Sequence, residues 1–243
     1  MRKLIGITLF FVLPLMGLGR VCADDQAKDI IAKAIKAAGG EDSLAKHNIV
    51  TFKETGIYYG MGDGIPYSGK YAIQRPDKFR MEIEGVFTLV SNGDKGWMSN
   101  MGQTNEMNKE QLAEQKNSHH ASNVATLLPL KDKEYSLTTL GESKLGDKAA
   151  VGVRVSRKGY RDVELFFDKN SNLLLKSKWQ AKAEELGGQE VTQEAFYQNH
   201  KDVDGAKIPM KIAIMRDGKK YVEADVSDYK VEAKLDDALF GKP

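Results

Sequence analysis

The sequence predicts a mainly β protein in which helices flank an antiparallel sheet. Two observations carry this prediction: apolar and polar residues alternate over many short segments, and turn-forming pairs separate those segments. A period of two gives a strand one apolar face, as at Phe79, Met81 and Ile83, which alternate with charged residues. Asn92-Gly93 and Asp217-Gly218 are typical of hairpin turns, so we expect consecutive strands to pair antiparallel.

The number of alternating segments favours a curved sheet. From Val50 to Val231 we expect roughly ten to twelve strands. A flat open sheet of that size is unusual, because strand twist makes wide sheets curl. We therefore predict a strongly curved sheet or partial barrel in a single domain over residues 24–243.

Two segments have helical rather than strand character. Asp25 can cap a helix that Gly39-Gly40 ends, and residues 43–47 add one more turn. The second segment is an insertion at residues 108–131, in which good helix formers precede an apolar stretch with Pro129. A helical excursion with an apolar end is suited to cover the concave face of a sheet.

Residues 1–23 are typical of a secretory signal peptide. Arg2 and Lys3 precede an apolar run, and Ala23 closes a segment that suits signal peptidase. We expect a mature chain that begins at Asp24 and a periplasmic or otherwise secreted protein. The apolar run is shorter than the roughly 20 residues of a membrane-spanning helix, so we expect no transmembrane span in the mature chain.

The single cysteine leaves an alternative open at this terminus. If the signal were of the lipoprotein type, Cys22 would be lipidated. That type resembles Leu-Ala-Gly-Cys, whereas Arg20 and Val21 stand here where small residues belong. With cleavage after Ala23 the mature chain has no thiol, so burial alone must hold the fold.

The charge balance argues against a nucleic-acid partner. The chain has 36 basic and 34 acidic residues. Loss of Arg2, Lys3 and Arg20 with the signal leaves 33 basic residues against 34 acidic ones, a net charge of −1. The charges are scattered singly, without the basic stripe of a nucleic-acid surface.

One stretch of the predicted strands carries a family resemblance. Residues 75–79 read Arg-Pro-Asp-Lys-Phe, and residues 91–97 read Ser-Asn-Gly-Asp-Lys-Gly-Trp. They resemble the Arg-Pro-x-x-Phe and Ser-Asp-Gly-x-x-x-Trp signature of periplasmic lipoprotein carriers of the LolA/LolB type. The resemblance implies an unclosed antiparallel half-barrel with an N-terminal helix and inserted lid helices. It also implies that Arg75 helps to hold the lid and that Phe79 lines an acyl-chain cavity.

The same resemblance implies a carrier function. The protein would bind a lipid or lipidated protein in an apolar cavity, with envelope proteins that donate or accept the cargo. Each buried methylene contributes about 0.8 kcal/mol, so such a site depends on apolar surface more than on any polar group. Each expected lining residue also suits a dry core; they are Phe79, Met81, Ile83, Trp97, Met98, Leu127, Leu128, Trp179, Met210 and Ile212.

Two alternatives remain at this point. The same fold can dock or sense a protein partner without lipid cargo. A metal-dependent hydrolase would use His119 or His120, but adjacent helical residues point about 100° apart and do not share one ligand face. No nucleophile elbow, phosphate loop or dinucleotide fingerprint occurs, so we expect no catalysis, cofactor or metal.

Overall fold

The structure is a computed structural model that describes residues 18–183 and 187–243. The first half of its strands comprises β1 (Ile49–Tyr58), β2 (Ile65–Gln74), β3 (Lys78–Ile83), β4 (Phe87–Asn92), β5 (Lys95–Asn100) and β6 (Gln103–Glu106). The second half comprises β7 (Tyr135–Leu145), β8 (Lys148–Arg157), β9 (Val163–Asp168), β10 (Leu174–Ala183), β11 (Gln189–Val203), β12 (Ala206–Arg216) and β13 (Lys219–Val231).

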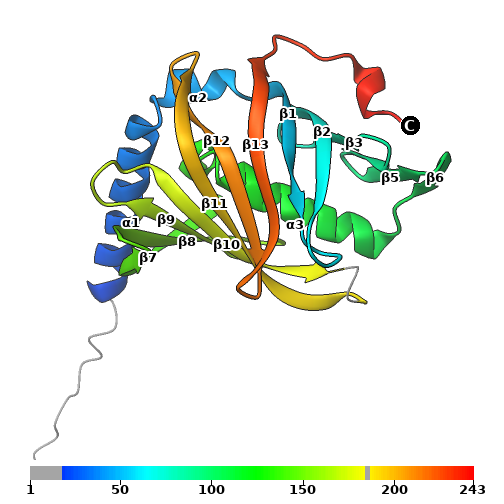
Figure 1. Ribbon diagram of the computed structural model, residues 1–243. Coiled ribbons are helices and arrows are strands. Elements are labelled where there is room, and N and C mark those ends of the chain that lie inside the picture. Colours follow the sequence, from blue (N-terminus) through cyan, green and yellow to red (C-terminus); the bar gives the residue numbers. More distant parts are fainter. Residues whose placement is uncertain (1–17, 184–186) are drawn as a thin grey trace, which may run out of the picture.

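These strands form one curved antiparallel sheet. Its order is β6-β5-β4-β3-β2-β1-β13-β12-β11-β10-β9-β8-β7. Within each half, consecutive strands are neighbours, and the pairing of β1 with β13 joins the two halves. Because β6 and β7 lie at opposite edges, the sheet stays unclosed, and it bends around a helix as a half-barrel (Figure 1).

Local turn chemistry explains most of the strand boundaries. Asp217 and Gly218 both adopt positive φ, 46° and 74°, which is the requirement of a two-residue type I′ hairpin. Asp204 and Gly205 make the same turn between β11 and β12. The sheet has thirteen strands where ten to twelve were expected. Strand β6 shows why, because its polar Gln-Thr-Asn-Glu sequence has no apolar alternation and pairs with β5 through its backbone.

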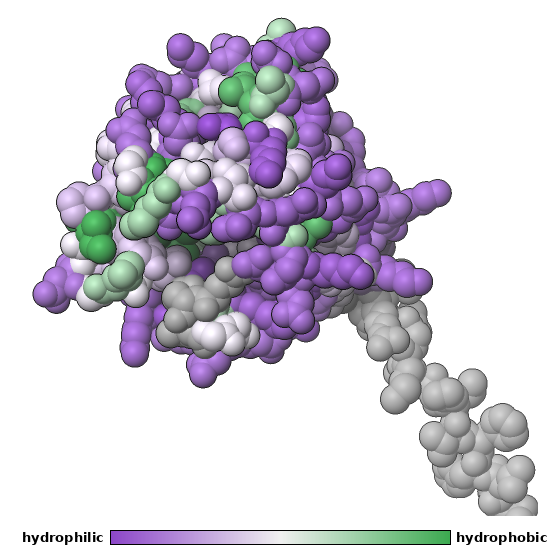
Figure 2. All heavy atoms as spheres, turned by 90° about the vertical axis from the view of Figure 1, so that its right-hand side faces the viewer, coloured by the Kyte–Doolittle hydropathy of each residue, from purple (hydrophilic) through white to green (hydrophobic). Residues whose placement is uncertain are grey.

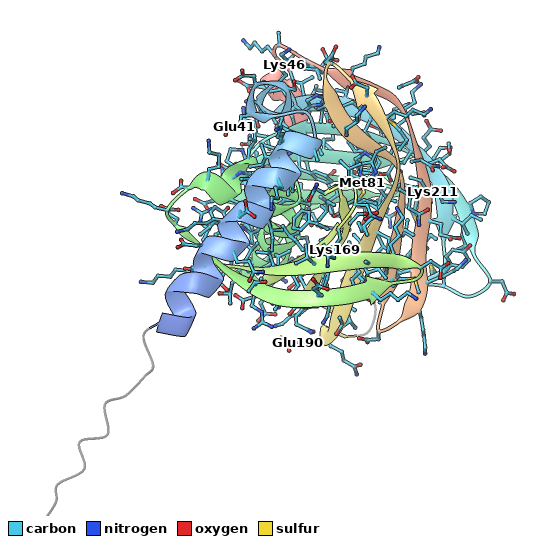
Figure 3. The ribbon with its side chains drawn as sticks, turned by 90° about the vertical axis from the view of Figure 1, so that its left-hand side faces the viewer. Glu41, Lys46, Met81, Lys169, Glu190 and Lys211 are labelled. Carbon is cyan, nitrogen blue, oxygen red and sulfur yellow. The ribbon has the colours of Figure 1, made fainter. Side chains whose placement is uncertain are left out.

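The N-terminal helix α1 (Leu18–Ala37) covers the β7 edge of the sheet (Figures 1 and 3). Its helical stripe buries Ile31, Ala34 and Ile35 against the core. The expectation that Asp25 caps this helix is wrong for the full-length chain. No proline interrupts residues 18–24, so the helix continues upstream of Asp25.

The predicted signal peptide falls mostly outside the described residues. Residues 18–23 form the first part of α1, and residues 1–17 are not described. Cleavage after Ala23 and lipidation of Cys22 therefore stay predictions. A short second helix, α2 (Glu41–Lys46), follows α1 at the position expected for one further turn. No helix of the described range has the length and apolar character that a membrane crossing requires.

The mid-chain insertion lies inside the curve of the sheet. It forms α3 (Lys109–Val124) and the 3-10 turn η1 (Leu128–Lys131). The side chain of Asn108 accepts bonds from the backbone N–H groups of Glu110 and Gln111, and the side chain of Gln111 accepts one from the backbone N–H of Asn108, so the start of α3 is a complete capping box. Figure 1 shows α3 behind β13, β1 and β2, across the concave face.

Two apolar clusters hold the fold. The larger one joins α1, α3 and η1 to the concave face of β7 to β11, where Val153, Val155 and Leu165 are fully buried. The smaller one lies on the convex face, where the C-terminal turn η3 (Asp237–Phe240) places Phe240 against Ala72 and Val90. The molecular surface on the face shown in Figure 2 is mainly hydrophilic, and its apolar residues form small separate groups.

We predict that Phe240→Ala lowers the free energy of unfolding by about 3–5 kcal/mol, because Phe240 has no exposed surface and its loss opens a cavity. Leu239→Ala is the matched control, since Leu239 is 36% exposed and its loss is expected to change stability by less than about 1 kcal/mol. Urea denaturation followed by circular dichroism measures both. Equal losses for the two variants would contradict this role of η3.

Candidate functional site

An aromatic row lines the concave face where β13, β1, β2 and β3 meet. Phe52 of β1 stacks on Tyr71 of β2 with ring centroids 4.7 Å apart, and on Tyr229 of β13 at 5.9 Å. Tyr71 meets Phe79 of β3 edge-on at 6.3 Å. These residues share one face because strand side chains alternate. The row leads to α3, where Phe79 packs on the ring of His119 at 4.6 Å.

Beside this row, a cavity of about 200 Å³ lies under the C-terminal end of α3 and η1. Its walls are mostly apolar and come from α3, η1, β1, β2 and the β11 to β13 strands. The lining includes Leu44, Phe52, Ile73, Arg75, Ala125, Leu127, Leu128, Tyr197, Ile212 and Tyr229. Small-molecule sites typically measure about 300–1,000 Å³, so this cavity is smaller than a site for a whole lipid.

The structure brings part of the predicted site together. Leu127, Leu128 and Ile212 line the cavity, and so does Arg75. Phe79 lies next to it under α3. The remaining predicted residues are placed elsewhere.

Met81 and Ile83 continue along the same face of β3 away from the cavity, and both are partly buried (Met81 is labelled in Figure 3). Met98 pairs with Leu89 on that face and is 37% exposed. Met210 lies on β12 and is partly buried, outside the residues that line the cavity. Trp179 is part of the packed core under α3.

Trp97 does not line the concave face, and this part of the prediction is wrong. Trp97 pairs with Val90 and packs against the cluster of Val90, Ala72 and Phe240 on the convex face. Trp97 and Met98 are adjacent apolar residues, so strand alternation sends one to each side of the sheet. Trp97 takes the convex side, where Phe240 of the C-terminal turn offers it an apolar partner.

The lid is held by Arg161 rather than by Arg75. Arg161, between β8 and β9, donates two bonds of 2.8 and 2.9 Å from Nη1 to the carboxylate of Glu114 on α3. The Arg161 backbone N–H donates to Asn117, also on α3, at 3.0 Å. Glu114 in turn accepts a bond from the backbone N–H of Lys182 at 2.9 Å. Arg75 instead donates to the backbone carbonyl of His47 at 2.7 Å, before β1.

Several lining residues were missed at the level of sequence. Phe52, Ile73 and Tyr229 are the clearest cases. Strand alternation over residues 50–58, 65–74 and 222–231 places them on the concave face, but the pairing of β1 with β2 and with β13 is needed to bring them together. Arg161 gives no sequence signal, because its partner lies 47 positions earlier in the chain.

A second hollow, polar and about 410 Å³ in volume, lies on the other side of α3. His119 bonds to Gln115 at 2.7 Å and approaches the Ser91 hydroxyl at 3.4 Å. The ring of His120 lies 4.2 Å from that of Tyr160 and 5.8 Å from that of Tyr135, both near-parallel to it. Burial lowers the pKa of both histidines to about 4, with Arg75 adding to the effect on His119.

The two histidines do not form a metal site with other groups. Nowhere in the described range do three His, Cys, Asp or Glu side chains converge as metal ligands. His119 and His120 both border the polar hollow but engage different partners, Phe79 and Tyr160, since adjacent helical residues point about 100° apart. The arrangement offers no support for the hydrolase alternative.

One carboxyl group also lies on the concave face. Glu54 of β1 accepts a bond from the Tyr67 hydroxyl at 3.2 Å, and burial raises the pKa of Glu54. The concave interior thus favours the neutral forms of Glu54, His119 and His120.

Comparison with known proteins rests on structure alone. No protein-family model matches the sequence, and no curated protein matches it. Among solved structures, a LolA superfamily protein from Nitrosomonas europaea superposes with a TM-score of 0.60 at 14% identity, covering 89% of this chain and 97% of the other. The fold is LolA-like.

Two further structures support this description of the fold. A DUF1329 family protein from Desulfovibrio piger gives a TM-score of 0.60 at 14% identity, covering 88% of this chain and 97% of its own. A putative outer membrane lipoprotein-sorting protein domain from Vibrio parahaemolyticus gives a TM-score of 0.54 at 13% identity, covering 89% of this chain and 97% of its own. The LolA-like half-barrel with its inserted helices is therefore confirmed, while identities this low establish the fold and not the ligand.

We predict an acid-sensitive fold from His119 and His120. The unfolded chain binds protons near the ordinary pKa of 6.5, whereas the folded chain binds them only near pH 4. Stability is therefore full above pH 6.5 and falls as the pH decreases, by ~1–3 kcal/mol between pH 6.5 and 5. Carboxylates with a lowered pKa also stabilise the fold, but they lose this contribution to stability only at a more acidic pH. Asp168, whose pKa lies below the ordinary value of 3.8, is an example.

Urea denaturation across this pH range checks the prediction. The double variant His119→Gln, His120→Phe is expected to have a flatter profile between pH 6.5 and 5 than the wild type. Parallel profiles for the two proteins would show that these histidines do not titrate as described.

Proposed function

We propose that this protein is an exported envelope protein that binds the acyl chain of a lipid or lipidated protein on the concave face of its half-barrel. The observation that carries the proposal is the apolar cavity between Phe52, Ile73, Ile212 and Leu127, bordered by an aromatic row and covered by α3 and η1. The signal-like residues 1–23 support an exported, periplasmic location.

The size of the cavity requires α3 to move when a long chain binds. Few apolar side chains hold α3, since Ala121 and Val124 are its buried apolar residues. Its remaining anchors are polar and centre on the partly buried pair of Glu114 and Arg161. Such bonds are worth about 1–3 kcal/mol each, whereas ten buried methylenes contribute ~8 kcal/mol. An acyl chain can therefore displace the lid at a net gain.

A carrier also needs partners that load and unload it. We propose envelope proteins in this role, since the similar domain from Vibrio parahaemolyticus is named for lipoprotein sorting. The protein would act as a binding module and not as a catalyst. The alternative is a docking or sensing module with a collapsed cavity. Native mass spectrometry of protein purified from an envelope extract distinguishes this alternative from the carrier. Co-purifying lipid supports the carrier, and its absence together with failure to bind a fluorescent fatty acid contradicts it.

We predict that Ile212→Trp weakens binding of a fluorescent long-chain fatty acid at least about tenfold, because the larger side chain fills the cavity. Ala213→Trp is the matched control, since the next residue of β12 points to the convex face. Its affinity is expected to stay within about twofold of the wild type. Fluorescence titration measures both, and melting curves confirm that each variant is folded. Equal losses for the two variants would remove the cavity from the binding site.

We predict that Glu114→Ala accelerates both binding and release of the same probe by about three- to tenfold, because it removes the main polar anchor of α3. Glu164→Ala is the control, as Glu164 pairs with Arg154 at the same 2.8 Å on the opposite face of the sheet. Stopped-flow fluorescence gives the rates. Unchanged rates in Glu114→Ala would mean that α3 does not gate the cavity.

A further inference from the structure

Among the described residues, Arg75 differs from several other arginines by having no carboxylate partner. Arg80, Arg154, Arg157 and Arg161 each pair with a glutamate within 3.1 Å. In the described part of the chain, Arg75 has no such ion pair. Its one side-chain hydrogen bond, of 2.7 Å from Nη1, goes to the backbone carbonyl of His47. A guanidinium has five N–H donors, so most of its binding capacity is left for another group.

The groups around Arg75 do not balance its charge. Its positive charge acts on Tyr229, His47 and His119, all of which are neutral at pH 7. Glu54, the carboxyl group on the same face, is engaged by Tyr67 and has a raised pKa. Burial lowers the pKa of Arg75, yet arginine stays protonated in proteins. A partly buried cation without a counter-charge costs free energy that an anion would recover.

The position of Arg75 gives that anion a place. Arg75 follows β2 and lines the apolar cavity together with Ile73, Phe52 and Leu127. Lys207 lines the same cavity, but it already pairs with Asp202 at 3.3 Å. The site thus places one uncompensated cation beside apolar walls. A molecule that matches both parts carries an anionic group at the end of a hydrocarbon chain.

We infer that Arg75 is a binding residue for the anionic headgroup of an acyl ligand, a carboxylate or a phosphate, whose chain occupies the adjoining apolar cavity. This inference rests on the proposed acyl-chain function and adds the chemical class of the ligand. The guanidinium fork suits either anion, because both accept two parallel N–H bonds. The headgroup completes the bonds that the His47 carbonyl leaves open.

The test compares two probes with the same labelled chain, a fluorescent fatty acid with a free carboxylate and its methyl ester, at pH 8. The wild type is expected to bind the acid at least about tenfold more tightly than the ester. In Arg75→Gln this ratio is expected to fall to about one through loss of acid affinity, while ester affinity stays within about threefold. Arg75→Lys keeps the charge and is expected to retain part of the preference.

Arg154→Gln is the matched control, since it removes an arginine that already pairs with Glu164, at 2.8 Å, on the opposite face of the sheet. Its acid-to-ester ratio is expected to equal that of the wild type. Competition with acetate, inorganic phosphate and a lysophosphatidic acid distinguishes the sources of the anion. Displacement by the long-chain phosphate and not by the two small anions supports an amphiphilic ligand, and displacement by the small anions alone contradicts it.

The outcomes separate this inference from the proposed function. Binding of neither probe to the wild type overturns the acyl-chain function itself. Equal binding of acid and ester by the wild type leaves that function in place and overturns the role of Arg75. A preference for the acid that survives in folded Arg75→Gln overturns it as well. Because equal binding by the wild type is enough to overturn the inference, it stays falsifiable even if Arg75→Gln fails to fold, and Arg75→Lys then serves as the second variant.

Discussion

The packing of α3 into the curve of the sheet is the constraint on which the rest of the structure depends. A thirteen-stranded sheet curls and exposes a broad apolar concave face, and one helix of sixteen residues cannot cover all of it. Together with α1, the insertion fills the half formed by β7 to β11, where the core is dry. The half around β1 to β3 is left with an aromatic surface and a cavity.

The way α3 is held distinguishes it from α1. Helix α1 buries an apolar stripe, with Ile31, Ala34 and Ile35, and packs against the β7 edge of the sheet. Helix α3 buries little apolar surface and depends on the bonds from Arg161 to Glu114 and Asn117. Under the proposed function, a helix with these contacts separates from the sheet at moderate cost, so that the same residues close the half-barrel and allow it to be opened.

The electrostatics of the interior follow from burial. The pKa of Glu54 is raised, and those of His119 and His120 are lowered, so each of these groups favours its neutral form. Arginine cannot respond in this way, because its guanidinium stays charged. Two cations border the cavity: Lys207 pairs with Asp202, whereas Arg75 keeps its charge without a carboxylate partner among the described residues. We link Arg75 to an anionic ligand because of this difference.

The amino-acid sequence by itself determined the parts with short-range causes. Alternation at Phe79, Met81 and Ile83 specified a strand, and Asp217-Gly218 specified its kind of turn, because pleat and turn geometry depend on neighbouring residues. It also located the insertion and named Leu127, Leu128 and Ile212, which line the cavity, while their contact with a ligand stays a prediction. Only the tertiary structure decided that Trp97 faces the convex side, that Arg161 holds the lid and that Arg75 has no carboxylate partner in the part of the chain that the structure describes. Each of these depends on residues far apart in the chain, Phe240, Glu114 and His47, and local sequence does not specify such pairings.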